Sequence, residues 1–262
     1  MTAWEPHPRR PDLRGVRVLV TGGTSGLGRA MAHALVQAGA QTIVTGRDPV
    51  RSADAARGLG GNAVGLAMDV RDESAVEQAV DEIDARFEGI DMLVNNAGIG
   101  MRSVNPRFLT EPQPFWAVTP DGFRDVVATK VTGSFLVARA VVARMIERGG
   151  GRVVMISMNT ATMSRKGFVP YGPSGAAVEA LAGVMAADLA GTAVTVNTLL
   201  PGGATATGMI PDDVPEAVRA RLLDPAIMGP PIVWLASPAA AGCHGERIVA
   251  SEFGDWLTRR KR

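Results

Sequence analysis

Short apolar runs alternate along the chain with longer segments whose apolar residues recur about every 3.6 positions, the period of a helix. The runs predict buried strands at 16–20, 41–45, 63–68, 90–94, 152–157 and 193–200, and a last short strand near 246–249. The periodic segments predict helices at about 26–38, 73–87, 121–147, 171–190 and 230–236, with a short Ala-rich helix before residue 63. Because right-handed crossovers place helices on both faces of a parallel sheet, this alternation predicts an α/β fold with a single doubly wound parallel sheet.

Two irregular stretches interrupt the alternation. Residues 99–120 are rich in proline and too long for an ordinary connection, and residues 203–228 begin as a loop rich in glycine and proline. Residues 1–14 lack the apolar run of a signal peptide, and we expect them to form a disordered N-terminal extension. Since no repeat or linker divides the remainder, we expect one domain over 15–262.

Composition and charge narrow the possible partners. Hydrophobic residues make up 46% and charged residues 20%, as in soluble globular proteins, and the formal net charge is +1. A charge this near zero argues against a dedicated nucleic-acid or membrane-surface binder, and no apolar run reaches the roughly 18 residues of a membrane span. Cys243 is the single cysteine and the three histidines lie far apart, so we expect neither an internal disulfide nor a metal site. A cytoplasmic location is the default expectation.

A glycine-rich turn follows the first predicted strand, in the stretch VRVLVTGGTSGLGRAMAHAL. Glycine tolerates positive φ and lets a backbone approach a ligand closely. The N–H groups at the start of the next helix are then free to meet an anion, usually a pyrophosphate. The turn therefore predicts dinucleotide binding, with tight packing of the glycines as the alternative.

Four short motifs stand in order along the predicted strands. They are TGGTSGLG at 21–28, MDV at 68–70, NNAG at 95–98 and PGG at 201–203. In order and spacing they resemble the motifs of the short-chain dehydrogenase/reductase (SDR) family, and the likeness runs from about Val16 to Val249. The resemblance implies a Rossmann-type domain that binds NAD(H) or NADP(H), acts on a small-molecule substrate and forms a homotetramer or homodimer.

The resemblance also implies which positions contact the cofactor. They are Gly22, Thr24, Ser25, Gly26, Leu27, Gly28, Arg47, Asp69, Val70, Asn96, Ala97, Gly98, Tyr171, Pro201, Gly202 and Thr205. Arg47 follows the second strand, where a basic side chain pairs with a 2′-phosphate and an acidic one favours the bare 2′-hydroxyl. We therefore expect NADP(H) to be preferred and NAD(H) to be possible, with an ordinary surface arginine as the alternative.

The helix after the fifth strand begins with YGPSG, where the family has Tyr-x-x-x-Lys. Tyr171, the only tyrosine, keeps its place, but Gly175 replaces the lysine. The family's serine, thirteen residues before the tyrosine, falls on Met158, with Ser157 one residue earlier. Where the family has Asn in N-x-x-G-x-F, the stretch KVTGSF has Lys130. The resemblance thus implies an atypical member with an altered catalytic tetrad, and the candidate catalytic residues are Tyr171, Ser157 and Lys130.

Lys130 is one of three lysines in the chain and stands at a position predicted to face inward. A positive charge about 4 Å from a phenol is worth about 4 kcal/mol at an effective dielectric of about 20, or about 3 pKa units. We hypothesise that Lys130 supplies the ammonium missing at Gly175. The alternatives are that Lys130 reaches solvent or pairs with a carboxylate. Lys166 is a second candidate for the ammonium, and Asn159 or Thr160 for the hydrogen bond of the serine.

The two irregular stretches are predicted to border the substrate. In 99–120, the aromatic residues that would wall an apolar pocket are Phe108, Phe115 and Trp116. The cations that would attract an acidic group are Arg102 and Arg107. A subunit contact or a surface flap is the alternative for this segment. Residues 203–228 are predicted to form a mobile lid, with Thr205 near the nicotinamide amide.

Together these features predict an NADP(H)-dependent oxidoreductase that transfers hydride between nicotinamide and a carbonyl or alcohol, with Tyr171 as the acid/base. Two alternatives remain open. One is a cofactor-binding protein without redox turnover, serving as a sensor or structural subunit. The other is a non-redox enzyme built on the same scaffold.

Overall fold

The computed structural model describes residues 11–260. Residues 1–10 of the predicted N-terminal extension therefore lie outside the described residues. Leu13 is fully buried and its backbone N–H donates to the carbonyl oxygen of Ala38 at 2.7 Å. The folded domain thus begins before residue 15, because an apolar side chain at position 13 completes the core under the first helix.

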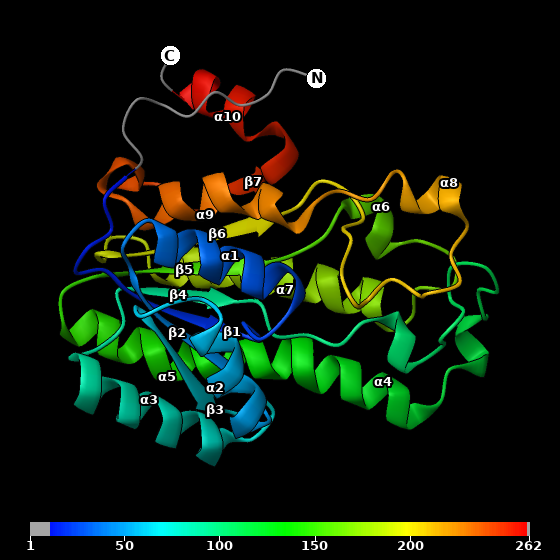
Figure 1. Cartoon of the computed structure of the whole chain (residues 1–262), viewed down its shortest axis with the longest axis horizontal. Helices are drawn as coiled ribbons and strands as arrows, with labels where there is room; N and C mark the ends of the chain where they lie inside the picture. The colour runs from blue at the N-terminus through cyan, green and yellow to red at the C-terminus, as the bar shows by residue number, and fades with distance from the viewer. Residues whose placement is uncertain (1–10, 261–262) are drawn as a thin grey trace.

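The centre of the molecule is one parallel sheet of seven strands in the order β3-β2-β1-β4-β5-β6-β7 (Figure 1). The strands are β1 (Arg17–Thr21), β2 (Gln41–Gly46), β3 (Ala63–Ala67), β4 (Met92–Asn95), β5 (Gly151–Ile156), β6 (Val194–Leu200) and β7 (Arg247–Val249). This is the predicted doubly wound, Rossmann-type arrangement. The direction of strand progression reverses between β1 and β4, and ligands of such sheets bind beyond the carboxyl ends of the strands at that reversal.

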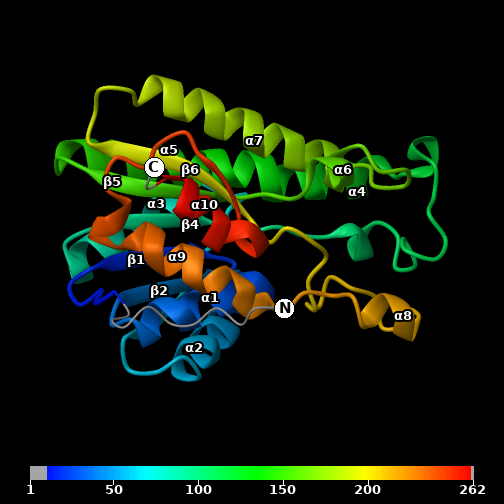
Figure 2. The ribbon, with the colours of Figure 1, turned by 90° about the horizontal axis from the view of Figure 1, so that it is seen from above.

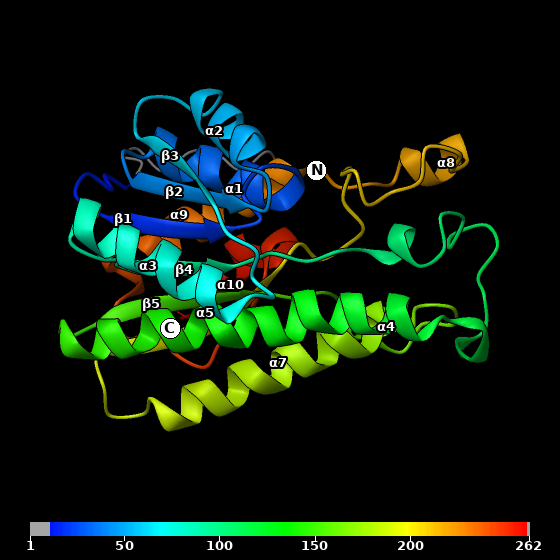
Figure 3. The same cartoon turned by 90° about the horizontal axis from the view of Figure 1, so that it is seen from below.

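Helices cover both faces of the sheet (Figures 1 and 3). One face carries α1 (Gly26–Gln37), α9 (Gly229–Ala236) and α10 (Phe253–Arg260), and the other carries α3 (Glu73–Phe87), α5 (Gly133–Glu147) and α7 (Tyr171–Asp188). The remaining helices are α2 (Pro49–Arg57), α4 (Pro120–Val127) and the short α6 (Thr160–Met163) and α8 (Glu216–Arg219). Residues 99–120 and α8 extend beyond the sheet at its carboxyl end, as Figure 2 shows.

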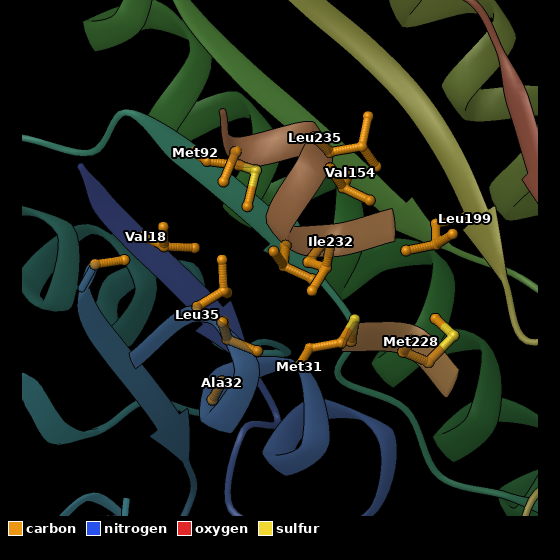
Figure 4. Packing of buried hydrophobic residues seen from close by; sticks show 14 of the residues in the cluster. Val18, Met31, Ala32, Leu35, Met92, Val154, Leu199, Met228, Ile232 and Leu235 are labelled. Carbon is orange, nitrogen blue, oxygen red and sulfur yellow. The ribbon is translucent and has the colours of Figure 1, made fainter. Parts of the chain in front are cut away.

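Alternating side chains of the strands pack into two separate hydrophobic cores, one on each face of the sheet. Val18 and Val20 of β1 point to the α1 and α9 face, whereas Leu19 between them points to the α3 and α5 face. All three are fully buried. Figure 4 shows the first cluster, where Leu35 of α1 and Ile232 of α9 meet the strand residues. A sheet buried on both faces explains why the strands read as continuous apolar runs.

The helix predicted at 121–147 is continuous from Pro120 to Glu147, but a π-helical turn, η3 (Ala128–Thr132), separates α4 from α5. An 18-residue window of this helix has a mean hydropathy of 1.6, so by length and composition it is apolar enough to cross a membrane, contrary to the sequence expectation. It lies on the sheet instead, and its polar side pairs Arg139 and Arg144 with acidic residues of α3. We therefore interpret it as a core helix.

Truncation of a core side chain should measure how strongly the helices are held to the sheet. Leu35 is fully buried, so Leu35→Ala should lower the free energy of unfolding by about 2–5 kcal/mol through lost burial and a cavity. Urea denaturation measures the change. Val50→Ala, at a side chain that is 67% exposed, is the control and should change stability by no more than about 0.5 kcal/mol. Equal effects of the two substitutions would contradict this packing.

Candidate active site

The glycine-rich turn lies at the carboxyl end of β1, where strand progression reverses. Gly22 and Gly26 have φ of +62° and +54°, a conformation that glycine adopts without strain. Gly28 packs so closely that a Cβ there would overlap the carbonyl oxygen of Gly22. The turn is therefore packed tightly against the start of α1, and a larger residue at position 28 would not fit.

The start of α1 leaves backbone donors free at this glycine-rich turn. Ser25 is its N-cap residue, in extended conformation, and its side chain makes no capping hydrogen bond. The first N–H groups of a helix carry partial positive charge and attract anions. The turn and the helix start thus fit the pyrophosphate of a dinucleotide, with Thr24, Gly26 and Leu27 beside Ser25 in the chain.

The NNAG segment is bound to the same turn by hydrogen bonds. The Asn96 side-chain amide donates to the carbonyl oxygens of Thr21 and Gly22 at 2.9 and 3.2 Å. The Thr21 hydroxyl in turn accepts the backbone N–H groups of Asn96 and Ala97, both at 3.0 Å. The predicted ribose and pyrophosphate segments are therefore one rigid unit. Thr21 was missed as a site residue, although it stands in the quoted TGGTSGLG motif.

The predicted adenine side of the site is formed by the ends of β2 and β3. Asp69 is held by Arg71, whose Nη2 lies 2.7 Å from a carboxylate oxygen, and this hydrogen bond keeps the pKa of Asp69 below its ordinary value. Val70 is buried against Gly133, where a Cβ would press into the valine side chain. Arg47 is exposed at the end of β2.

Beyond β6, Pro201 is buried and Gly202 adopts a φ of +96°, facing Ser251 too closely for a Cβ. The amide of Asn159 donates to the Gly202 carbonyl oxygen at 2.9 Å, which connects the end of β5 to this turn. Asn159 thus has a structural partner of its own. Thr205 is buried and forms an isolated parallel bridge with Leu223.

The structure brings Lys130 and Tyr171 together. Lys130 belongs to the π-helical turn η3, is only 8% exposed, and places its Nζ over the Tyr171 ring, 4.9 Å from the centroid. Gly98 makes room on the other side, because a Cβ there would lie 3.0 Å from Lys130 Cγ. Lys130 is therefore buried and does not extend into solvent. Within residues 11–260, no carboxylate forms an ion pair with it. Lys166 is exposed.

Burial changes the proton affinity of both groups. Loss of hydration lowers the pKa of Lys130 to about 8 from its ordinary 10.5. The same cause raises the pKa of Tyr171. An ammonium over the ring acts in the opposite direction on the phenol, since it stabilises the tyrosinate.

Met158 fills the space next to Gly175. A Cβ at position 175 would lie 2.5 Å from the terminal methyl of Met158 and 2.7 Å from its sulfur. Ser157 faces elsewhere, because neighbouring residues of an extended strand end point to opposite sides. Its hydroxyl donates to Glu179 at 2.8 Å, and the same carboxylate binds Arg247. The Ser157 hydroxyl therefore already has a hydrogen-bond partner other than Tyr171.

The segment 99–120 contributes one of the three predicted aromatic walls. Phe108 is buried in a small cluster with Met101, Phe168 and Tyr171. Phe115 and Trp116 instead contact each other and are exposed by 67% and 76%. The cations predicted to attract an acidic group are both engaged by the protein itself, Arg102 by Asp212 and Arg107 by Glu111.

Comparison with known proteins decides the family. The sequence profile of the family described as short chain dehydrogenase matches residues 16–216, which include the glycine-rich turn, NNAG, Tyr171 and PGG. The chain belongs to the short-chain dehydrogenase family. It is 33% identical to the 3-oxoacyl-(acyl-carrier-protein) reductase FabG of Vibrio harveyi over 244 residues, which cover 90% of this chain and 96% of that protein. It is 34% identical to the gluconate 5-dehydrogenase of Gluconobacter oxydans over 201 residues, 75% of this chain and 74% of that protein.

Solved structures of SDR proteins have the same fold. The 3-ketoacyl-(acyl-carrier-protein) reductase of Brucella melitensis, complexed with NADH, superimposes with a TM-score of 0.81 at 27% identity, covering 90% of this chain and 97% of that one. A putative gluconate dehydrogenase of Agrobacterium tumefaciens gives a TM-score of 0.81 at 32% identity, covering 92% and 97%. This SDR chain is therefore an oxidoreductase with a Rossmann-type NAD(P)-binding fold.

The buried ammonium of Lys130 predicts a pH-dependent stability. At neutral pH the lysine is protonated in both states, so only the folded state bears the desolvation cost, at most about 3 kcal/mol for a pKa lowered from 10.5 to about 8. From pH 8 to 10.5 the unfolded state alone keeps the proton, and stability rises with pH. Lys130→Met should therefore be more stable than the parent protein at pH 7, and this advantage should shrink by about 2 kcal/mol by pH 9.5.

Urea unfolding of both proteins at the two pH values measures the difference. Lys166→Met, at an exposed lysine in the loop before α7, is the matched control and should show the same difference at both pH values. A pH-independent effect of Lys130→Met would show that the ammonium is not buried as the structure has it.

Proposed function

We propose that this SDR is an NADP(H)-dependent oxidoreductase that transfers hydride between nicotinamide and a carbonyl or alcohol substrate, with Tyr171 as the acid/base. One observation carries the proposal. A buried, unpaired Lys130 ammonium lies 4.9 Å from the centre of the Tyr171 ring. Burying a charge without a protein partner is costly, and the tyrosinate that forms during proton transfer is the anion it would stabilise.

The size of this effect suits acid/base chemistry. For separations of about 5–8 Å between the ammonium and the phenolate oxygen, at an effective dielectric of about 20, one positive charge favours the tyrosinate by on the order of 2–3 kcal/mol, or about 2 pKa units. This opposes the burial that raises the pKa of Tyr171. In the reducing direction Tyr171 donates its phenolic proton to the carbonyl oxygen, and in the oxidising direction the tyrosinate takes the proton of the alcohol. Lys130 stabilises the phenolate, and the nicotinamide supplies or accepts the hydride when bound.

The proposed cofactor contacts are the positions expected from the sequence. Three features support them: the close packing at Gly28, the uncapped start of α1 and the hydrogen bond from Asn96 to the turn. The preference for NADP(H) rests on Arg47. It is exposed at the end of β2, and no carboxylate within residues 11–260 pairs with it, so its guanidinium is free to bind a 2′-phosphate.

Under this proposal, the changes at three positions of the catalytic tetrad depend on one another. Met158 and Gly175 occupy the positions of the family's serine and lysine, and the methionine side chain fills the room that the glycine leaves. The cation then comes from Lys130, on the opposite side of Tyr171. Ser157 is not part of this arrangement, since its hydroxyl is bound to Glu179.

The same substitutions support a second candidate function. Met158 and Gly175 remove two polar side chains beside Tyr171, and a site poor in hydrogen-bond donors stabilises an oxyanion less well. The chain would then bind the cofactor without redox turnover, or use Tyr171 as a proton donor for non-redox chemistry. Tight NADPH binding without turnover of any carbonyl would favour this second function.

We also propose that the protein works in the cytoplasm as a homodimer or homotetramer. Large apolar side chains are exposed along one long helical face of the molecule. They are Phe123, Phe135, Ile146 and Val184, on α4, α5 and α7. Exposed apolar surface of this kind is typical of subunit contacts.

Removal of the Tyr171 hydroxyl or of the Lys130 ammonium should abolish most of the turnover. Tyr171→Phe and Lys130→Ala should each lower kcat by about 10²-fold or more, because a positioned acid/base contributes about that much. The measurement is NADPH oxidation against a panel of aldehydes and ketones, with NADPH binding followed separately by fluorescence. Lys166→Ala is the control lysine and should keep full turnover.

A rescue experiment tests whether Lys130 replaces the lysine that the family has at position 175. In the Lys130→Ala background, Met158→Ser combined with Gly175→Lys should return part of the lost turnover, because it restores the family's pattern around Tyr171. Unchanged activity of Lys130→Ala itself would refute the role proposed for this lysine.

Arg47 should decide which nicotinamide cofactor binds better. Arg47→Ala should weaken NADPH binding by about tenfold to a hundredfold, since a charge-assisted hydrogen bond is worth about 1.5–3 kcal/mol. NADH affinity should stay the same, which makes NADH the internal control in a fluorescence titration. A parallel loss of both affinities would mean that Arg47 supports the fold of the site and does not bind the 2′-phosphate.

A further inference from the structure

The predicted lid is held at its base by a short backbone pairing. The backbone N–H of Ala206 donates to the Leu223 carbonyl oxygen at 2.9 Å, and the Leu223 N–H donates to Ala204 at 2.8 Å. Residues 207–222 therefore leave and rejoin the fold at one point. The excursion includes α8 and lies at the carboxyl end of the sheet, near the segment 99–120 (Figures 2 and 3).

Arg102 holds the first part of this excursion. Its Nη1 donates to the carbonyl oxygens of Gly208 and Ile210 at 3.1 and 3.2 Å, and its Nη2 donates to Asp212 at 3.1 Å. The two carbonyl groups are those of the residues on either side of Met209. One guanidinium from the segment 99–120 thus fixes the backbone that presents the Met209 side chain.

Met209 is placed directly in front of Tyr171. Its sulfur lies 3.9 Å from the Tyr171 hydroxyl oxygen, which donates to it. On its other side is Gly100, where a Cβ would lie 3.1 Å from both Cγ and the sulfur of Met209. The thioether therefore occupies the space between Gly100 and the phenol.

We propose that Met209 is a specificity-determining residue, which limits the size of the group beside the substrate carbonyl, and that Arg102 is a positioning residue that holds Met209 there. The inference rests on the proposed role of Tyr171 as acid/base. A carbonyl oxygen that takes the phenolic proton must lie within about 3 Å of the Tyr171 hydroxyl, which is space that the Met209 side chain now borders and partly fills.

The chemistry of the surroundings indicates the class of substrate. Tyr171 packs against Met101, Phe108 and Phe168, and Met209 adds another apolar group at its hydroxyl. A methionine side chain is flexible and polarisable, so it can adapt to a small apolar group but leaves little room for a bulky one. Lys130, whose Nζ lies 4.9 Å from the centre of the Tyr171 ring, is the cation beside this space. The preferred substrates are therefore carbonyl compounds with a small apolar group next to the carbonyl.

The single tyrosine allows a direct test that needs no substrate. Tetranitromethane nitrates accessible phenols, and in this chain the product reports on Tyr171 alone. Met209→Ala and Arg102→Ala should each raise the nitration rate by about tenfold or more, because a state that is open at most about a tenth of the time becomes dominant. Met209→Leu, which keeps an apolar side chain of similar size, and Arg107→Ala, a control arginine of the same segment, should nitrate at the parental rate.

Turnover then tests specificity. With NADPH and unbranched 2-ketones of increasing length, Met209→Ala should improve kcat/KM for the longer ketones by about tenfold relative to the shortest one. Arg102→Ala should change KM more than kcat, as expected of a positioning residue. Parental nitration rates in Met209→Ala and Arg102→Ala, or an unchanged size preference, would overturn the inference. Faster nitration combined with full activity of Tyr171→Phe would instead refute the proposed function and leave Met209 as a cover of the phenol.

Discussion

The arrangement of the candidate site depends on one costly feature, the ammonium of Lys130 buried beside the only tyrosine of the chain. A lysine side chain gains stability when its charge stays hydrated, and here burial removes that hydration and lowers the pKa of Lys130. The surrounding structure makes the position possible. The π-helical turn places Lys130 toward the sheet, and Gly98 leaves room for its aliphatic stem. Among the residues from 11 to 260, the partner that stabilises this ammonium is the face of the Tyr171 ring.

The residues at positions 175 and 158 affect the same buried charge, because they decide whether a second cation could fit near Lys130. A lysine at position 175 would compete with the methionine for space and would add a second ammonium close to the first, and two like charges in a poorly hydrated site repel strongly. An apolar Met158 against a bare glycine avoids both problems. Under the proposed function, the three departures from the family pattern are therefore one change, in which the cation moves from one side of the phenol to the other.

The opposite wall of the site is built by segments that are distant in sequence. Arg102 follows β4, whereas the lid follows β6, and they meet because parallel strands direct both connections to the same edge of the sheet. The turn proposed to bind the cofactor is rigid, since Thr21 and Asn96 hold it by hydrogen bonds. The lid is attached through the backbone pairing at its base, through Arg102 and through the contact of Met209 with Tyr171. Under the proposed function, a rigid cofactor-binding turn and a lid that can detach from the fold suit an enzyme that admits and releases a small molecule.

Much of the molecule could be predicted from local patterns. The strands, α3 at Glu73–Phe87 and the glycine-rich turn follow from apolar periodicity and from the backbone freedom of glycine, which are properties of neighbouring residues. The order of the motifs was sufficient to indicate the family, and the position of Tyr171 at the start of a helix pointed to its candidate role. The sequence also raised the hypothesis that Lys130 compensates for Gly175, because an inward lysine and a missing lysine can both be recognised from the sequence, and the structure places Lys130 beside Tyr171.

Only the tertiary structure decided what these residues touch. Ser157 and Met158 differ by one position, yet the Ser157 hydroxyl binds Glu179 and the Met158 side chain packs against Gly175, a difference that depends on how the end of β5 turns. Arg102 and Phe115 have plausible chemistry for a substrate, yet the first binds the lid and the second is exposed. Met209 carries no signal in its own neighbourhood, since it meets Tyr171 across 38 residues of chain. Local sequence determines the elements because their energetics are local, whereas contacts between loops depend on the packing of the whole sheet that brings them together.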